Sequence, residues 1–336
     1  LRSMEEASTV FVDMVQLNQA AGEVVARACS AEKGLVTAGC AAAQVLMVAA
    51  CMTGTDEGKV EQLPDSNGMK NEVVIYSGHR NRYDGAFKIP GAKLVTYGTE
   101  VDVTGAQLDR AINSDTCAIA FVIGPGLTEG IGLQKTIEIA HSRNIPVILD
   151  AAAEVPPRAN LTRFIELDVD MVAFSGGKGI GGPQSSGLLA GRSELIDAAF
   201  INSLNLHSDK AGIGRPMKVS KENIIGLVTA LQLFLEGDEQ FEYQNWRNKA
   251  NYVASKLANI PGLTVLVEDT PVHRQGPQPV IYFGEDWDGP STSEIRRRLL
   301  NGDPPIHVGL GGSKSDEINI VMVNVLDGEE KLIVER

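Results

Sequence analysis

The chain has no long apolar run, no basic-then-apolar leader at its start and no closely spaced pair of cysteines. The longest uncharged apolar stretch, residues 40–52, is too short to cross a bilayer, so we expect no contact with membranes. Cys29, Cys40, Cys51 and Cys117 show no C-x-x-C spacing, so we expect four free thiols and no metal site. These absences favour a cytoplasmic protein.

An excess of positive charge is absent as well. The 336 residues carry 30 Lys and Arg against 43 Asp and Glu, a net charge of -13, and the pI is near 4.9. Such a balance disfavours binding to nucleic acids and anionic membranes, so we expect neither as a partner. The sequence begins at Leu1 rather than at a methionine, and we therefore expect an N-terminal segment to precede it.

What the chain does contain is a lysine between glycines. An apolar run at residues 171–174 leads into Ser175-Gly-Gly-Lys178-Gly-Ile-Gly-Gly-Pro-Gln184, and a second apolar run, residues 145–149, ends at Asp150. Glycines leave no side-chain bulk beside the amine and permit tight turns. Two strand ends would thus present an aspartate and a lysine, the pair that pyridoxal phosphate (PLP) requires. The amine holds the cofactor aldehyde, and the carboxylate keeps the pyridine nitrogen protonated.

Each of these motifs also has an ordinary structural explanation. A glycine-flanked lysine after a strand is usually a solvated loop residue, and an aspartate at a strand end is usually a cap or turn former. Residues 177–182 fit the G-x-G-x-x-G pattern of dinucleotide sites, but Pro183 and a strand-like segment follow instead of a helix. Whether these motifs form a PLP site therefore depends on the rest of the chain.

Apolar runs and helical patterns alternate along most of the chain, which predicts an α/β fold with a mainly parallel sheet and helices on both faces. We expect an N-terminal helix in residues 1–30, a large PLP-binding domain in 31–235 and a small α+β C-terminal domain in 236–336. In detail, the patterns predict one helix over residues 5–29 and a strand over residues 319–325.

Two further segments lie where such a sheet binds ligands. Gly39 precedes an alanine-rich helix that starts at Cys40 and Ala41, whose free backbone N–H groups would form a phosphate seat, although a plain buried helix explains the same residues. Past the strand at residues 71–77 lie a histidine and two arginines: His79, Arg80 and Arg82. The imidazole could stack on a cofactor ring and the guanidiniums could pair with phosphate or carboxylate, although surface arginines commonly do neither.

Together these motifs resemble the selenocysteine-synthase-like family of fold-type-I PLP proteins, which is related to L-seryl-tRNA(Sec) selenium transferase. The resemblance covers nearly all of the chain, and its most specific motif is the Ser175–Gln184 run. The other matching segments occur in family order: Thr37–Ala43, Ser77–Arg80, Asp150–Glu154 and Gly214–Lys221. Within the family, the chain is most similar to the ammonia-lyases of phosphorylated amino sugar acids.

The resemblance implies a role for each candidate residue. Lys178 would hold the cofactor and move the α-proton, Asp150 would face the pyridine nitrogen, and His79 would stack on the ring face opposite Ala152. The cofactor phosphate would be held by the hydroxyl of Ser175 and by the backbone N–H groups of Gly39, Cys40 and Ala41. The substrate anions would be bound by four basic residues: Arg80, Arg82, Arg215 and Lys218. Lys218 stands where the family has an arginine, which argues against bidentate anion binding at that position.

The resemblance further implies a PLP-dependent carbon–nitrogen lyase that assembles into at least a homodimer. Its reaction would be an α,β-elimination that converts a substrate such as D-glucosaminate 6-phosphate to 2-keto-3-deoxygluconate 6-phosphate and ammonia. Selenium transfer onto seryl-tRNA is an alternative that the acidic chain disfavours. Aldol cleavage or racemisation of a hydroxy amino acid shares the first steps and stays open. A noncatalytic scaffold is the third alternative, against which the presence of both Lys178 and Asp150 argues.

Overall fold

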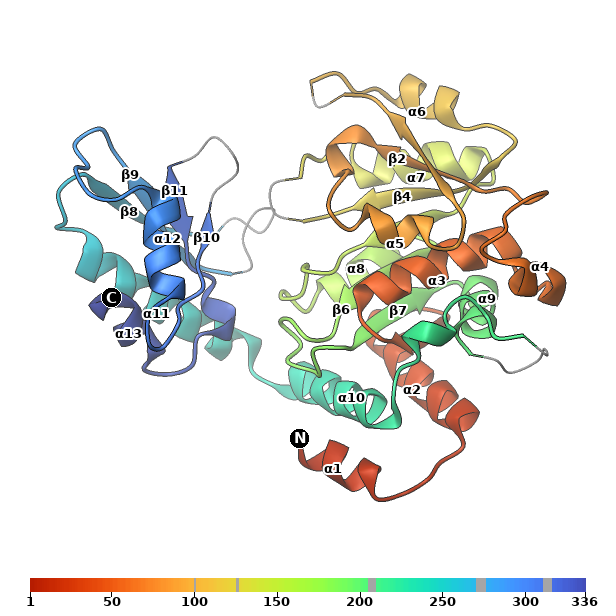
Figure 1. Ribbon diagram of the computed structural model, residues 1–336, viewed down its shortest axis with the longest axis horizontal. Helices are drawn as coiled ribbons and strands as arrows, with labels where there is room; N and C mark the ends of the chain where they lie inside the picture. Colours follow the sequence, from red (N-terminus) through yellow and green to blue (C-terminus); the bar gives the residue numbers. More distant parts are fainter. Residues whose placement is uncertain (100, 125–126, 205–209, 270–275, 311–315) are drawn as a thin grey trace. The chain divides into compact units, whose positions relative to one another are not determined.

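The computed structural model of the protein describes residues 1–99, 101–124, 127–204, 210–269, 276–310 and 316–336 (Figure 1). These residues form two units, Leu1–Glu236 and Gly237–Arg336. The three-part division expected from the sequence stays a prediction. All of the candidate site residues belong to the first unit.

A seven-stranded sheet forms the centre of the first unit, in the order β1-β7-β6-β5-β4-β2-β3. Its strands are β1 (Lys33–Thr37), β2 (Glu72–Tyr76), β3 (Lys93–Tyr97), β4 (Thr116–Val122), β5 (Val147–Asp150), β6 (Met171–Ser175) and β7 (Gly187–Gly191). The five strands from β6 to β3 are parallel to one another, whereas β7 is antiparallel to both of its neighbours. The predicted mainly parallel sheet is therefore confirmed.

Helices cover both faces of this sheet (Figure 1). One face packs against α2 (Met14–Cys29), α6 (Gly105–Ala111), α7 (Leu133–Ser142), α8 (Asn160–Glu166) and α10 (Lys221–Glu236). The other packs against α3 (Cys40–Thr53), α5 (Asp84–Lys88) and α9 (Ser193–Ser203). Neighbouring strand residues point to opposite faces, so Val74 lies in one core while Val73 and Ile75 lie in the other. The strands are buried on both sides, which explains their unbroken apolar runs.

The N-terminal segment differs from the single helix predicted over residues 5–29. The structure has α1 (Arg2–Ser8) and, after an interruption, α2. The carboxylate of Asp13 accepts hydrogen bonds from the backbone N–H groups of Val15 and Gln16 at 2.8 and 3.0 Å, and so starts a new helix. An aspartate at this position satisfies donors that a helix leaves unpaired, which is why it begins a helix more readily than it continues one.

The second unit contains a four-stranded antiparallel sheet in the order β10-β11-β9-β8. Its strands are β8 (Leu263–Glu268), β9 (Gln278–Phe283), β10 (Gly309–Leu310) and β11 (Glu317–Asn319), and its helices are α11 (Glu239–Leu257), α12 (Thr292–Leu300) and α13 (Glu329–Glu335). The strand predicted over residues 319–325 is wrong in its larger part. Strand β11 ends at Asn319, and Met322–Asn324 form a 3-10 turn. Among the helices of the described ranges, none combines the length and the apolar character that crossing a bilayer requires.

Candidate active site

The carboxyl ends of the central strands bring most of the predicted site residues to one edge of the sheet. Asp150 ends β5 and Ser175 ends β6, the next strand in the sheet. Strand β1 runs in the same direction as β6 because both are antiparallel to β7, and its last residue, Thr37, shares a register with Gly187 and Ser175. The turns that follow β1, β5 and β6 therefore lie together, at the edge where open α/β sheets bind ligands.

The loop that carries Lys178 is packed too closely for side chains at its glycines. A Cβ atom added to Gly179 would lie 2.3 Å from the carbonyl oxygen of Val155, and one added to Gly177 would lie 2.7 Å from Cα of Gln184. Gly181 has a φ of +72°, which other residues rarely adopt. The glycines thus hold the lysine loop against the segment that follows Asp150. Lys178 itself is exposed, and within the described part of the chain its amine forms no hydrogen bond or ion pair.

Asp150 is buried and accepts three hydrogen bonds. Its Oδ1 accepts from the backbone N–H of Ala152 at 3.1 Å and from the thiol of Cys40 at 3.3 Å, and its Oδ2 accepts from the side-chain amide of Gln44. Burial raises the pKa of this carboxyl, while the three donors and the charge of Lys178 lower it. Cys40 and Gln44 take part through their side chains, a contact that the sequence did not predict.

Glu154 is a second carboxyl of the site that the sequence did not single out. It lies in the loop after β5, and its backbone is held by hydrogen bonds with Ala151 and with the side chain of Asn160. Burial raises the pKa of Glu154 to about 7; the charge of Lys178 lowers it and that of Asp150 raises it. A carboxyl that titrates near neutral pH beside the lysine is a candidate for proton exchange. The signal that could have found it was its place at the end of the Asp150–Glu154 motif.

The start of α3 has the backbone geometry of a phosphate seat. Gly39 precedes the helix with a φ of 100°, and nothing lies within 4 Å of where its Cβ would be. The first backbone hydrogen bond inside the helix runs from Ala43 to Gly39, which leaves the N–H groups of Cys40 and Ala41 directed out of the helix end. Gly187 allows the close approach of β7, because a Cβ there would lie 2.7 Å from the carbonyl carbon of Gly39.

His79 lies at the same edge, two strands beyond β5, in the short 3-10 turn after β2. Its ring packs edge-on against Phe121, with 4.3 Å between the centroids, and is only 1% exposed. Nε2 contacts the carbonyl oxygen of Thr128 at 2.9 Å and Nδ1 lies 3.5 Å from the backbone N–H of Val122, so the neutral imidazole protonated at Nε2 fits both. Burial lowers the pKa of His79 to about 4. Stacking of this ring on a cofactor stays a prediction.

The four basic residues proposed for substrate anions are divided between two segments. Arg80 forms an ion pair with Asp84 and donates to Thr96 at 2.8 Å. Arg82 is exposed nearby. The exposed side chains of Arg215 and Lys218 lie in and just after a 3-10 turn beside α9.

The segment that carries Arg215 and Lys218 leads directly to the lysine loop. Ser220 begins α10 by accepting a hydrogen bond from the backbone N–H of Asn223 at 3.2 Å. The side chain of Asn223 then donates to Ser185, in the turn that follows Lys178, at 2.9 Å. Of the two pairs of basic residues, Arg215 and Lys218 are therefore the pair whose segment is linked to the lysine loop by hydrogen bonds in the described structure.

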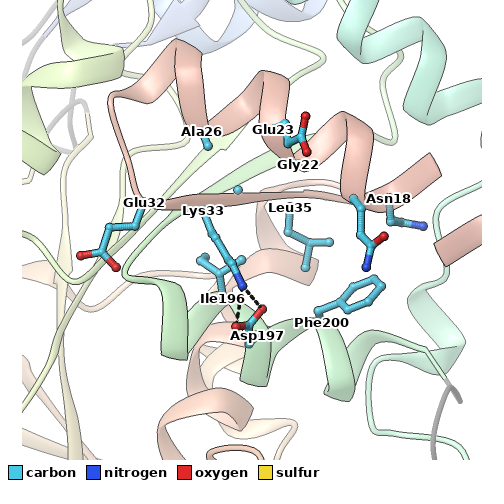
Figure 2. A pocket seen from close by; sticks show the side chains of 12 residues that line it. Asn18, Gly22, Glu23, Ala26, Glu32, Lys33, Leu35, Ile196, Asp197 and Phe200 are labelled. Carbon is cyan, nitrogen blue, oxygen red and sulfur yellow. Dashed lines mark hydrogen bonds and ion pairs between the residues drawn. The ribbon is translucent and has the colours of Figure 1, made fainter. Parts of the chain in front are cut away.

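A cavity of about 320 Å³ lies elsewhere, beside the edge strand β1 (Figure 2). It is lined by residues of α2, β1 and α9, including Lys33, whose amine pairs with Asp197 at 2.6 Å. Lys33 and Met171 both pair with Gly191 of β7, so Lys33 is level with the first residue of β6. Lys178, by contrast, follows the last residue of β6. The cavity therefore lies toward the amino ends of β1 and β6, whereas the candidate site lies at their carboxyl ends, so the cavity is not part of the candidate site. Within the described ranges, no cluster of three or more His, Cys, Asp or Glu side chains could hold a metal ion.

The residues at the carboxyl edge fit the pyridine-type cofactor expected from the sequence. A buried carboxyl with a raised pKa is stabilised in its ionised form by a nearby cation, and a protonated pyridine ring is such a cation. Ser175 pairs with Gly187, which packs against Gly39 and Cys40, so its hydroxyl and the backbone N–H groups at the start of α3 would suit an anion. The exposed amine of Lys178 follows the strand next to Asp150.

Comparisons with known proteins agree with this fit. The family model of L-seryl-tRNA selenium transferase (SelA) matches residues 16–245. A 5'-C-glycyluridine monooxygenase-decarboxylase from Streptomyces sp is 30% identical over 316 residues, which cover 92% of this chain and 76% of that protein. The D-glucosaminate-6-phosphate ammonia lyase of Salmonella typhimurium is 28% identical over 342 residues, covering 100% of this chain and 88% of that protein.

Solved structures extend the agreement to three dimensions. A structure of D-glucosaminate-6-phosphate ammonia-lyase superposes with a TM-score of 0.83 at 28% identity and covers 99% of this chain and 88% of that one. A C-DES mutant with glycine covalently linked to its PLP cofactor superposes with a TM-score of 0.62 at 14% identity, covering 100% of this chain and 91% of that one, and shows the fold alone. The predicted fold-type-I class and the resemblance stated from the motifs are both confirmed.

Proposed function

Because the chain belongs to the L-seryl-tRNA selenium transferase (SelA) family, we propose that it is a PLP-dependent carbon–nitrogen lyase of a phosphorylated 2-amino sugar acid. A substrate of this kind is D-glucosaminate 6-phosphate, which would yield 2-keto-3-deoxygluconate 6-phosphate and ammonia. The observation that carries this proposal is the whole-chain likeness to an ammonia-lyase of that substrate, with a TM-score of 0.83. The juxtaposed ends of β5 and β6, with Asp150 and the loop of Lys178, supply the chemistry.

The cofactor would be held by residues of four segments. Asp150 would pair with the pyridine nitrogen, and Ala152 and His79 would lie against the ring. The phosphate would be bound by the hydroxyl of Ser175 and the backbone of three residues: Gly39, Cys40 and Ala41. When bound, PLP supplies an electron-accepting ring that stabilises the negative charge left on Cα when its proton is removed.

Lys178 would serve as the base that removes the α-proton of the substrate. The electron pair of the Cα–H bond would form the Cα–Cβ double bond as the 3-hydroxyl departs with a proton as water. Hydrolysis at C2 would then release ammonia and leave the keto acid. Glu154, whose pKa of about 7 is influenced by the charge of Lys178, would be a candidate to exchange protons at the site.

The substrate phosphate and carboxylate would be bound by the basic residues. Arg215 and Lys218 are favoured, because the segment that carries them contacts the lysine loop through Asn223 and Ser185. Arg80 and Arg82 are the second pair, and Arg80 would have to exchange its partner Asp84 for the ligand. We further propose, from the resemblance, a cytoplasmic enzyme that is at least a homodimer.

The deciding experiment incubates D-glucosaminate 6-phosphate with the protein and PLP, and measures ammonia and 2-keto acid. We expect the wild-type protein to release both products. In Lys178→Ala the rate of release should fall by at least about a thousandfold, because the base is removed. Arg215→Ala and Lys218→Ala should raise KM more than they lower kcat, and an unchanged KM would remove them from the substrate site.

Oxygen uptake is measured in the same assay, because one relative is named a monooxygenase-decarboxylase. Consumption of oxygen with release of carbon dioxide, and no ammonia from the sugar acid, would overturn the lyase proposal. Release of a free aldehyde or inversion at Cα without ammonia would favour the aldolase or racemase instead.

A further inference from the structure

A polar side chain on a mostly apolar helix contacts the carboxyl of Asp150. Gln44 is 2% exposed, and its amide donates a hydrogen bond to Oδ2 of Asp150. Cys40 lies one helical turn earlier and donates to Oδ1 at 3.3 Å. Residues four apart share one face of a helix, so α3 holds both oxygens of the carboxyl from a single face.

The composition of α3 shows that this contact is specific. Gln44 is the only amide or charged side chain among Cys40–Thr53, and its neighbours are alanine, valine, leucine and methionine. Within the described structure, Oε1 of Gln44 is buried without a hydrogen-bond partner, so the amide is half satisfied. Burial of an unpaired carbonyl is costly, and packing alone would favour an apolar residue there. The contact with Asp150 is what the glutamine provides.

The physical effect of this contact is on the ionisation of Asp150. Burial favours the neutral carboxyl, whereas donors directed at its oxygens favour the carboxylate. A carboxylate is the form that pairs with a protonated pyridine nitrogen. The same helix carries the phosphate seat at its first residues, so the phosphate and ring ends of the cofactor would be positioned by one rigid element.

We propose that Gln44, assisted by Cys40, is a positioning residue that keeps Asp150 ionised and directed at the ring nitrogen of the cofactor. The inference rests on the proposed function for the identity of that cofactor. The side chains of Gln44 and Cys40 would thus set the protonation of the ring, and therefore its strength as an electron acceptor, without contacting the substrate.

A purely structural role for Gln44 is the competing explanation, and the chain offers a matched control. Asn202 is a fully buried amide whose Nδ2 donates to Thr53, at the far end of α3, and to Ala198, both at 2.9 Å. Its Oδ1 is unpaired in the described structure, as is Oε1 of Gln44. Asn202→Leu in α9 and Gln44→Leu in α3 therefore each remove a buried, half-paired amide, and of the two only Gln44 contacts Asp150.

The test loads the full chain with PLP labelled with ¹⁵N in the ring. The ¹⁵N shift reports ring protonation, and equilibrium dialysis gives the dissociation constant of PLP. We expect Gln44→Leu to move the ¹⁵N signal toward the neutral ring and to weaken PLP binding by about tenfold, the effect of one hydrogen bond to a charged group. Asn202→Leu should retain the wild-type signal and affinity.

Cys40→Ala and Cys40→Ser form a second pair that keeps the inference testable if Gln44→Leu does not fold. The alanine should shift the ¹⁵N signal in the same direction, and the serine, which restores a donor, should not. A wild-type signal in both Gln44→Leu and Cys40→Ala, or equal losses in Gln44→Leu and Asn202→Leu, would overturn the inference. Failure of the wild-type chain to bind PLP would instead overturn the proposed function.

Discussion

Burial controls the protonation of three side chains at the carboxyl edge of the sheet. It raises the pKa of Asp150 and of Glu154 and lowers that of His79. In each case the charged form is the one that loses hydration, and the neutral form is therefore favoured. The stability of the protein should therefore depend on pH through these groups.

Glu154 should destabilise the cofactor-free protein as pH rises. Its pKa is raised from 4.5 to about 7, so its contribution to stability is complete below the ordinary value and is lost as pH rises through the folded value. Between pH of about 4.5 and 8, we expect wild type to lose about 2 kcal/mol relative to Glu154→Gln, after discounting for partial exposure. Urea unfolding of both proteins at several pH values measures the difference. A constant difference across this range would contradict the assignment.

His79 should act in the opposite direction, at lower pH. Its pKa is lowered from 6.5 to about 4, so its contribution is complete above the ordinary value and is lost as pH falls through the folded value. We expect wild type to lose about 3 kcal/mol of unfolding free energy over this interval relative to His79→Gln. Only the pH dependence of the difference is diagnostic, because the substitution also changes packing around Phe121. Parallel profiles for the two proteins would show that the imidazole is not buried in its neutral form.

Among the elements, the lysine loop depends on its glycines for a steric reason. Residues 176–186 join β6 to β7 and pack against the segment after Asp150. Hydrogen bonds from Gly182 to the carbonyl of Gly176 at 2.8 Å and from Gly176 to Ser186 at 2.9 Å hold the loop in shape. A lysine placed by such a loop has a fixed backbone and a mobile side chain, which suits an amine that must both bind a cofactor and move a proton.

Gly179→Ala tests this packing. The added Cβ would lie 2.3 Å from the carbonyl oxygen of Val155, so the loop must move, and we expect a loss of about 1–3 kcal/mol in unfolding free energy together with weaker PLP binding. Gly85→Ala is the matched control, because nothing lies within 4 Å of its Cβ position in α5 and alanine is the better helix former. Urea midpoints at constant m-value measure both. Equal midpoints for the two variants would show that the loop has room for a side chain.

For the molecule as a whole, the charge balance favours the proposed lyase activity over selenium transfer to a tRNA, the activity after which the family is named. With 30 basic and 43 acidic side chains, the chain carries a net charge of -13. Binding of a tRNA depends on Lys and Arg contacts to its phosphates. The net charge of this chain therefore disfavours a tRNA substrate, independently of any active-site residue.

The chain should not bind seryl-tRNA. In filter binding at low salt, where phosphate contacts are strongest, we expect no saturable binding at concentrations up to roughly 10 μM, within the range of ordinary nonspecific affinities. A basic tRNA-binding protein serves as the positive control in the same buffer. Saturable binding that weakens steeply with added salt would contradict the expectation and reopen the transferase alternative.

Much of the fold, and the positions of Asp150 and Lys178 after neighbouring strands, could be predicted from the sequence. The spacing of apolar runs located the parallel strands, and glycine-flanked Lys178 and strand-ending Asp150 were identified from local chemistry. Such features are local, because strand periodicity and turn residues depend on neighbours within a few positions. The single helix predicted over residues 5–29 failed for a local reason too, since the Asp13 side chain competes for the backbone.

Tertiary structure alone decided which side chains share the edge with that pair. Gln44 lies 106 positions from Asp150 in the chain and became its partner only because α3 packs on the same sheet. Glu154 acquired its raised pKa from burial, and Arg80 was found already paired with Asp84. Desolvation and long-range hydrogen bonds depend on what surrounds a group in space, and no local pattern encodes that. The sequence by itself therefore determined the sheet and the placement of Asp150 and Lys178 after neighbouring strands, while the packing determined how these two side chains are held and charged.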